Sequence, residues 1–199
     1  PILVSAPTAI SNPTGADVVS SGDPTVRSII VAPVNGAVVR WELSTDNNQW
    51  SPLSANSNTY AYSNLTQSTF FRVVTKNGAC AETVSSIPVK ITVARGGTVS
   101  ASQGTEFCAP STATTLSVSN LEGTSYVWES AVSPFSSWSA VASNVPSIPV
   151  SGLTETTRYR VNVNTNRAFS NEITITVSAP TVQGSLSTAN ATVCENDGT

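Results

Sequence analysis

Alternating apolar and polar residues along the chain predict β-strands rather than helices. Around the first tryptophan, Val39, Trp41 and Leu43 alternate with two charged residues, so we expect these three side chains on the buried face of a strand. The same two-residue period recurs in residues 71–73, 115–119, 159–163 and 173–177. No apolar stripe of helical period accompanies these segments over the length of a helix. The pattern therefore predicts an all-β fold.

The pattern occurs twice, at a nearly fixed spacing. Trp41 and Trp128 lie 87 residues apart, and Trp50 and Trp138 lie 88 residues apart. A repeating unit of this size, built from several short strands, is typical of a small immunoglobulin-like sandwich. We therefore predict tandem immunoglobulin-like antiparallel β-sandwich domains.

A recurring pentapeptide marks where one unit ends and the next begins. Val-Ser-Ala-Pro-Thr occurs at residues 4–8 and again at 177–181, each time after a predicted last strand. We expect residues 1–8 to be the last strand of a preceding repeat, 9–94 to form repeat 1, 95–179 to form repeat 2 and 180–199 to start a following repeat. The chain is thus expected to be an internal slice of a longer protein. Short junctions at 94–97 and 178–181 should limit bending, the second more strongly because of Pro180.

The predicted core is built on one tryptophan in each repeat. A large aromatic residue on the third strand contributes roughly 1.5–3 kcal/mol when it is buried between two sheets. We expect Trp41 and Trp128 in this role, with Phe71 and Tyr159 packed opposite them and Leu65 and Leu153 closing the end of each sandwich.

Composition excludes several classes of function. Charged residues make up only 11% of the chain and the net charge is −3, so the basic surface of a nucleic-acid-binding protein is absent. The chain contains no histidine, which excludes Ser-His-Asp and Cys-His nucleophile systems. No apolar run of about 18 residues occurs, so we expect no membrane insertion by this segment. We predict a protein that is not an enzyme and holds no cofactor.

The acidic residues are candidates for catalytic or metal-binding groups. Glu42 and Glu129 recur, but they occupy equivalent positions in different repeats and cannot form the carboxylate pair of a glycosidase. We expect both on the outward face of a strand. The runs at residues 46–48 and 195–198 lack the late bidentate carboxylate of a calcium loop, so we expect turns there. No metal site is predicted.

Trp50 and Trp138 are the remaining candidates for a ligand-binding role. Each follows the turn after the tryptophan-bearing strand. They either cap the edge of the sandwich or form an exposed platform on which a sugar ring stacks. The sequence leaves both interpretations open.

A longer shared motif carries a family resemblance. Leu-Thr-x-[Ser/Thr]-Thr-x-[Phe/Tyr]-Arg-Val occurs at residues 65–73 and 153–161. Together with Gly-Thr-Val-Ser at 97–100 and Ile-Thr-Ile-Thr-Val at 173–177, it resembles the tandem immunoglobulin-like repeats of the very large SprB-type gliding adhesins of Bacteroidota. The resemblance covers nearly the whole chain.

The resemblance implies a place of action and partners. Such adhesins are exported through the type IX secretion system, stay attached at the outer membrane and serve in adhesion and gliding. The expected partners are neighbouring repeats of the same chain and the secretion and gliding machinery, with a surface polysaccharide as a further candidate. Two alternatives stay open: a carbohydrate-binding or spacer module of a secreted polysaccharide-degrading enzyme, and a surface-filament subunit that assembles by strand addition.

The three cysteines depart from the family pattern, in which a repeat tends to carry one cysteine near its start and another after an Asn-Gly turn. Repeat 1 has only the later one, Cys80, and repeat 2 only the earlier one, Cys108, while Cys194 follows in the next repeat. Counting favours a Cys80–Cys108 bond, whereas their expected places at distant poles of consecutive domains argue against it. The pairing stays open, with free thiols slightly favoured.

Overall fold

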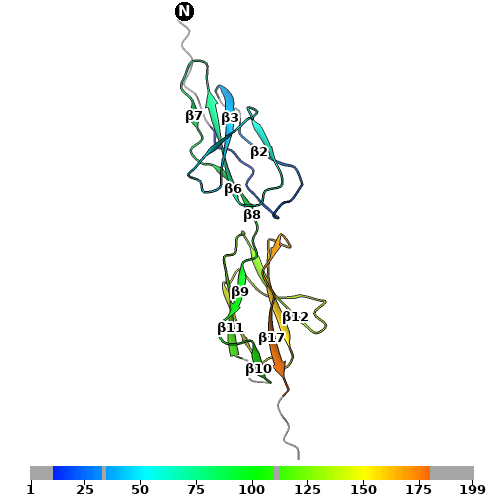
Figure 1. The fold of residues 1–199 in the computed structure, drawn as a ribbon. Coiled ribbons are helices and arrows are strands. Elements are labelled where there is room, and N and C mark those ends of the chain that lie inside the picture. Colours follow the sequence, from blue (N-terminus) through cyan, green and yellow to red (C-terminus); the bar gives the residue numbers. More distant parts are fainter. Residues whose placement is uncertain (1–10, 33–34, 110–112, 180–199) are drawn as a thin grey trace, which may run out of the picture.

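The structure, a computed structural model, describes residues 11–32, 35–109 and 113–179. It contains two β-sandwiches joined end to end, each formed by one repeat (Figure 1). The predicted partial repeats at 1–8 and 180–199, with Pro180 and Cys194, lie outside the described residues. No helix in the described ranges is long and apolar enough to cross a membrane.

The described residues form eight strands in repeat 1 and nine in repeat 2. Repeat 1 contains β1 (Asp17–Val19), β2 (Arg27–Ile30), β3 (Ala37–Ser44), β4 (Ser51–Leu53), β5 (Thr59–Tyr62), β6 (Thr69–Lys76), β7 (Thr83–Val84) and β8 (Val89–Val93). Repeat 2 contains β9 (Thr98–Ala101), β10 (Glu106–Cys108), β11 (Ala113–Ser119), β12 (Tyr126–Val132), β13 (Ser139–Ser143), β14 (Ser147–Ser151), β15 (Thr157–Val163), β16 (Ala168–Phe169) and β17 (Ile173–Ser178).

The larger sheet has the same strand order in both repeats. It runs β1-β8-β6-β3-β4 in repeat 1 and β10-β17-β15-β12-β13 in repeat 2, with β7 and β16 as short hairpin partners of β6 and β15. The smaller sheet pairs β2 with β5 in repeat 1 and comprises β14-β11-β9 in repeat 2. Two sheets of this order facing each other form an immunoglobulin-like sandwich, and the predicted fold class is confirmed.

The first strand of each repeat is divided between the two sheets. In repeat 2, β9 pairs with β11 in the smaller sheet, and β10 then joins β17 in the larger sheet as a parallel neighbour. Repeat 1 does the same with an isolated bridge between Thr14 and Ile30, followed by the parallel pairing of β1 with β8. Each otherwise antiparallel sandwich therefore contains one parallel pair, which the sequence did not predict.

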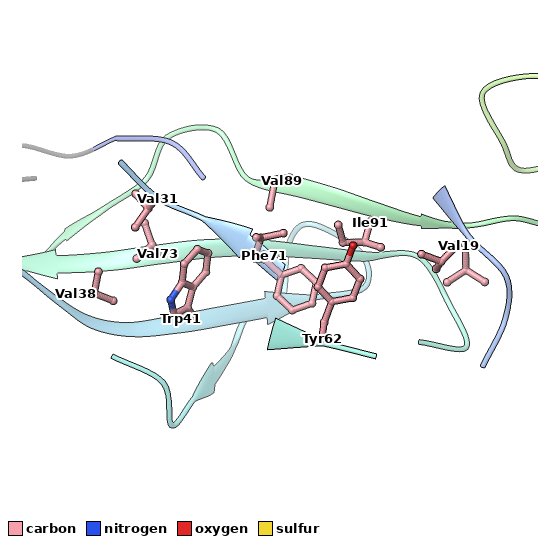
Figure 2. Packing of buried hydrophobic residues seen from close by; sticks show 11 residues of the cluster. Val19, Val31, Val38, Trp41, Tyr62, Phe71, Val73, Val89 and Ile91 are labelled. Carbon is pink, nitrogen blue, oxygen red and sulfur yellow. The ribbon is translucent and has the colours of Figure 1, made fainter. Parts of the chain in front are cut away.

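Trp41 lies at the centre of the first core (Figure 2). Its side chain is fully buried, and its indole N–H donates to the carbonyl of Ser57 at 2.8 Å. The ring that contacts it from the smaller sheet is Tyr60, with a centroid distance of 6.0 Å. Phe71 is also buried, but it lies on β6, beside β3 in the same sheet. The expectation that Phe71 packs opposite Trp41 was therefore wrong, because the two strands are hydrogen-bonded neighbours.

The second core repeats this arrangement with different neighbours. Trp128 is fully buried and donates its indole N–H to the carbonyl of Val145 at 2.8 Å. Tyr159 lies on β15, the neighbour of β12, so it too shares a sheet with its tryptophan and does not face it. The smaller sheet contributes Leu116 and Ile148 to this cluster. Leu65 and Leu153 are half-buried residues packed against the first and second clusters, respectively.

A β-bulge corrects the predicted orientation of Val39. In the pairing of β3 with β6, Val38 lies opposite Thr75 and Arg40 opposite Val74, so Val39 is the extra residue. A bulge of this kind shifts the alternation of side chains by one position. Val38 consequently points into the core with 6% exposure, whereas Val39 is 36% exposed.

Candidate functional sites

Trp50 and Trp138 occupy the same place in the two sandwiches. Trp50 immediately precedes β4 and Trp138 immediately precedes β13, the edge strands of the larger sheets. Both indoles are half-buried. Because the core tryptophans face inward from the neighbouring strands, the side chains that gather around Trp50 and Trp138 belong to the outer face of each sheet.

An arginine stacks on each of these indoles. The guanidinium of Arg72 lies 4.1 Å from the ring centroid of Trp50, and that of Arg160 lies 4.0 Å from the ring of Trp138. Arg160 also lies 4.2 Å from the ring of Phe169 on β16, so its guanidinium contacts two aromatic rings. Contacts of this geometry are cation–π interactions. The indoles therefore pack on protein groups instead of standing as bare platforms.

The recurring glutamates complete this arrangement. Arg72 forms an ion pair with Glu42 at 2.7 Å, and Arg160 forms one with Glu129 at 2.8 Å. We call the set Trp50, Arg72, Glu42 in repeat 1 and Trp138, Arg160, Glu129 in repeat 2 the Trp–Arg–Glu ladder. The two glutamates lie on the outer faces of separate sandwiches, so the structure does not bring them together as a catalytic pair.

Glu42 is the most enclosed carboxylate of the ladder, with a residue exposure of only 7%. Burial acts to raise the pKa of Glu42, but hydrogen bonds from Arg72 and Arg40 outweigh it and hold the pKa below its ordinary value. Arg40 reaches further to Glu82 at 2.7 Å. Glu42 is therefore held in its ionised form by two arginines on the outer face of the sheet.

The junction between the repeats forms a second cluster, which the sequence did not indicate. The chain passes from β8 to β9 through residues 94–97, and Ala94 is buried in the core of repeat 2. Arg95 exchanges two backbone hydrogen bonds with Glu122, of 2.8 and 3.0 Å. The side chain of Glu122 then accepts hydrogen bonds from two residues of repeat 1, Lys90 at 2.9 Å and Ser68 at 2.5 Å. These contacts tie repeat 2 directly to repeat 1.

A second ion pair spans the same junction. Arg167 of repeat 2 lies 3.6 Å from Asp23 of repeat 1, which also pairs with Arg27 at 3.0 Å. The hydrogen bond from the backbone N–H of Thr25 is the largest cause that lowers the pKa of Asp23, to about 2. Asp23 therefore stays ionised over the whole range of ordinary pH.

The turn after β3 behaves as expected from its sequence. One carboxylate oxygen of Asp46 accepts hydrogen bonds from the backbone N–H groups of Asn48 and Gln49 and from the hydroxyl of Ser44, each at 2.8 Å. This pattern closes an Asx-type turn. Among the described residues no group of three or more acidic or cysteine side chains could hold a metal ion, and the acidic run at 195–198 lies outside them.

Cys80 and Cys108, the two cysteines among the described residues, are widely separated. Cys80 lies in the turn between β6 and β7, whereas Cys108 ends β10 and is exposed. Because β7 and β10 lie at opposite ends of the molecule (Figure 1), these two residues are not bonded to each other. A staple between Cys80 and Cys108 of one chain is therefore excluded by distance.

Sequence reasoning missed the arginines of the ladder, although a signal was present. Arg72 and Arg160 follow an aromatic residue at the same position of the repeated motif, and strand alternation alone accounts for them only as outward polar residues. Their spacing from Trp50 and Trp138 was also conserved between the two repeats. An outward arginine that recurs together with an outward tryptophan indicates that the pair belongs to one structure.

One family profile matches the chain twice in succession. A domain of unknown function, DUF8696, is matched by residues 8–95 and again by residues 95–179. No curated protein matches the chain.

Several solved structures are similar to the chain at low identity. Three N-terminal domains of the outer capsid protein Hoc of bacteriophage RB49 are 10% identical, with a TM-score of 0.45 over 81% of this chain and 56% of that one. The chain therefore spans little more than half of the phage fragment. A two-domain fibronectin type III segment of chicken tenascin is 13% identical, with a TM-score of 0.35 over 78% and 93% of the two chains. Fibronectin(III)-like modules of CbhA from Clostridium thermocellum are 12% identical, with a TM-score of 0.34 over 86% and 93%.

Proposed function

Since the chain belongs to the DUF8696 family and contains two tandem copies of its domain, we propose that it is a rod-like segment of a long extracellular adhesin. The segment is non-catalytic. The segment extends a binding region away from the bacterial surface and serves in adhesion and gliding motility. Its direct partners are the neighbouring repeats of the same chain. The secretion and gliding machinery at the outer membrane acts on the rest of the protein.

The rod proposal rests on the junction between the repeats, whose residues are packed against the protein. A flexible tether would leave residues 94–97 in solvent, but Ala94 is buried and Gly96 is packed against the backbone of Phe169 and Ser170. Hydrogen bonds from Lys90 and Ser68 of repeat 1 to Glu122 of repeat 2 also hold the two repeats together on one side of the junction. Such a junction transmits the direction of one repeat to the next, which is what an extended spacer requires.

The surface location and the gliding role rest on the repeated motif, not on the geometry. The motif at residues 65–73 and 153–161 resembles gliding adhesins of Bacteroidota. Hydroxyl-rich strands with few charges suit a protein exposed to the medium. The carbohydrate-binding alternative is favoured by a separate feature, a hollow on repeat 2 lined by residues that include Val127, Ala140 and Asn162. The strand-addition alternative depends on residues 1–8 and 180–199, which lie outside the described residues.

Small-angle scattering on the whole chain tests the rod. We expect an elongated particle that fits two sandwiches end to end and is unchanged by calcium. A compact particle would mean that the repeats fold back on each other, and the rod proposal would fail.

Antibody fragments raised against repeats 1 and 2 test the location and the role. Applied to intact cells of the source organism, they should label the surface and slow gliding. Labelling that requires permeabilised cells would overturn the extracellular assignment. Surface labelling without any effect on gliding or attachment would overturn the motility role and leave the rod intact.

A further inference from the structure

A hollow of about 260 Å³ opens on the outer face of repeat 2. It lies over β12, between β13 and the turn that follows β15. Its lining includes Ser125, Val127, Glu129, Ala140, Asn162 and Thr165. We propose that this hollow binds one ring of a neutral saccharide. The inference goes beyond the rod proposal and does not depend on it.

Comparison of the two repeats shows why the hollow is present. In repeat 1 the residue one position before the core tryptophan is Arg40, whose guanidinium lies on the outer face and donates to Glu42 at 2.8 Å. In repeat 2 the same position holds Val127, which is too short to cover the strand. The residue of β13 opposite Glu129 is Ala140, which is also small. Two small side chains therefore leave open the space that an arginine occupies in repeat 1.

The charge of the hollow favours a neutral ligand. Glu129 already pairs with Arg160 at 2.8 Å and accepts a hydrogen bond from the amide of Asn162 at 2.7 Å. Its negative charge is thus balanced, so the site has no unpaired charge that would select a cation. The guanidinium of Arg160 is engaged by Glu129 in the same ion pair, so it offers no unpaired positive charge that would select an anionic ligand.

The lining combines apolar and hydroxyl groups. Val127 and Ala140 offer a small apolar floor, and Ser125 and Thr165 offer hydroxyls that both donate and accept hydrogen bonds. A pyranose ring presents the same combination, with C–H groups on one face and hydroxyls at its rim. The volume lies below the roughly 300–1,000 Å³ of drug-sized sites, so it suits one sugar ring and not an extended oligosaccharide.

One wall of the hollow is fixed in an unusual conformation. Asn164, Thr165 and Asn166 have φ angles of 47°, 51° and 68°, three consecutive residues in the left-handed region. For a β-branched residue such as Thr165 this conformation is a costly outlier. The turn is held by Asn162, which accepts from the N–H of Asn166 at 2.7 Å and donates to its side-chain oxygen at 2.9 Å. Hydrogen bonds therefore fix the strained backbone of this turn in the absence of a ligand. Such preorganisation lowers the entropy cost of binding.

Amide NMR on the whole chain tests the proposal. The probes are the methyl glycosides of glucose, galactose and mannose, with glucuronic acid as the anionic comparison. We expect saturable shifts of the amides of Val127, Asn162 and Thr165 with at least one neutral glycoside, and smaller shifts with glucuronic acid. Absence of shifts at these amides with every probe would overturn the proposal.

A matched pair of substitutions locates the effect. Val127→Arg imports the residue of repeat 1 and should abolish the shifts, whereas Val26→Arg, at a residue that is 71% exposed on the other repeat, should leave them unchanged. If Val127→Arg does not fold, Ala140→Leu at an exposed position of β13 fills the same space and should give the same loss. Ligand-induced amide shifts that persist in folded Val127→Arg or Ala140→Leu would contradict the proposed binding site.

Discussion

The ammonium group of Lys90 in repeat 1 donates a hydrogen bond of 2.9 Å to the carboxylate of Glu122 in repeat 2. The same carboxylate oxygen accepts the hydroxyl of Ser68, whose oxygen in turn accepts the backbone N–H of Val93 at 2.9 Å. Glu122 thereby connects β8 and the residue just before β6 in repeat 1 with the loop between β11 and β12. The side chain of Glu122 thus helps to fix the orientation of repeat 2 relative to repeat 1.

Removing the ion pair between Lys90 and Glu122 should widen the range of inter-repeat orientations with little effect on the stability of either repeat. Glu122→Gln and Lys90→Met each break the ion pair, which is partly exposed and contributes less than about 1 kcal/mol. We expect the unfolding midpoint of each repeat to stay nearly constant, while residual dipolar couplings show a wider range of inter-repeat orientations. Lys76→Met, at an exposed end of β6, is the matched control and should keep the original alignment. Identical couplings in all three variants would show that the apolar part of the junction suffices.

Acidification should loosen the same junction. Burial acts to raise the pKa of Glu122, but hydrogen bonds from Ser68 and Lys90 prevail and hold the pKa below its ordinary value of 4.5. A lowered pKa means that the ionised carboxylate stabilises the folded junction above pH 4.5, and that this contribution is lost as the pH falls through the lower folded value. The dipolar couplings of the unaltered chain should therefore spread at acidic pH, and those of Glu122→Gln should not change further.

Gly96 should be the least replaceable residue of the junction. A β-carbon added there would overlap the backbone of Phe169 and Ser170, and backbone atoms cannot move aside as a flexible side chain can. Overpacking of this kind costs about 1–3 kcal/mol. We expect Gly96→Ala to lower the melting temperature of repeat 2, whereas Gly104→Ala, with no atom within 4 Å of the added carbon, should be neutral. Equal melting temperatures for both variants would contradict the packing.

The fold could be predicted from the sequence because its signals are local and occur twice. Strand alternation identified the core positions of Trp41 and Trp128, since a two-residue period needs no knowledge of distant contacts. The prediction failed at Val39, where a bulge shifts the alternation, and bulges leave no mark in a single apolar pattern. It also failed for the relation of Phe71 to Trp41, because alternation shows which face a residue occupies but not which strand lies beside it.

The candidate sites depended on contacts that sequence spacing does not reveal. Glu122 lies 32 residues from Lys90, and their meeting is a consequence of how two sandwiches stack end to end. The hollow of repeat 2 depends on the difference between Arg40 and Val127, which becomes meaningful only when the strands are aligned in space. The recurrence of Trp50 and Trp138 is visible in the sequence, but the arginines that stack on them are visible there only as polar positions of alternating strands.

The two tryptophans of the cores should report on separate folding units. Trp41→Phe removes the donor to the Ser57 carbonyl, and Trp128→Phe removes the donor to the Val145 carbonyl. Each change leaves a buried void and an unpaired acceptor, so we expect a loss of about 2–4 kcal/mol in the affected repeat. Calorimetry should show two transitions, of which only one moves in each variant. A parallel shift of both transitions would mean that the repeats unfold as one unit.

The second arginine of the ladder should contribute more than the first. Arg160 stacks on both Trp138 and Phe169, at 4.0 and 4.2 Å, whereas Arg72 stacks on Trp50 alone. A lysine retains the charge and the reach to the glutamate, but it loses the flat surface that lies between two rings. Cation–π contacts are worth about 0.5–1 kcal/mol at exposed sites and about 2 kcal/mol when desolvated. We therefore expect Arg160→Lys to destabilise repeat 2 by about twice as much as Arg72→Lys destabilises repeat 1.

A double-mutant cycle separates stacking from the ion pair. Phe169→Leu keeps an apolar side chain on β16 and removes only one ring, so the cost of Arg160→Lys should fall when Phe169→Leu is already present. The cost of Arg72→Lys should not respond to Phe169→Leu, because that arginine lies in the other repeat. Chemical denaturation of the unaltered chain, the three single variants and the two double variants measures both quantities. Additive costs for Arg160→Lys and Phe169→Leu would contradict the prediction, because they would show that the ring of Phe169, 4.2 Å from the guanidinium, adds nothing to the contribution of Arg160.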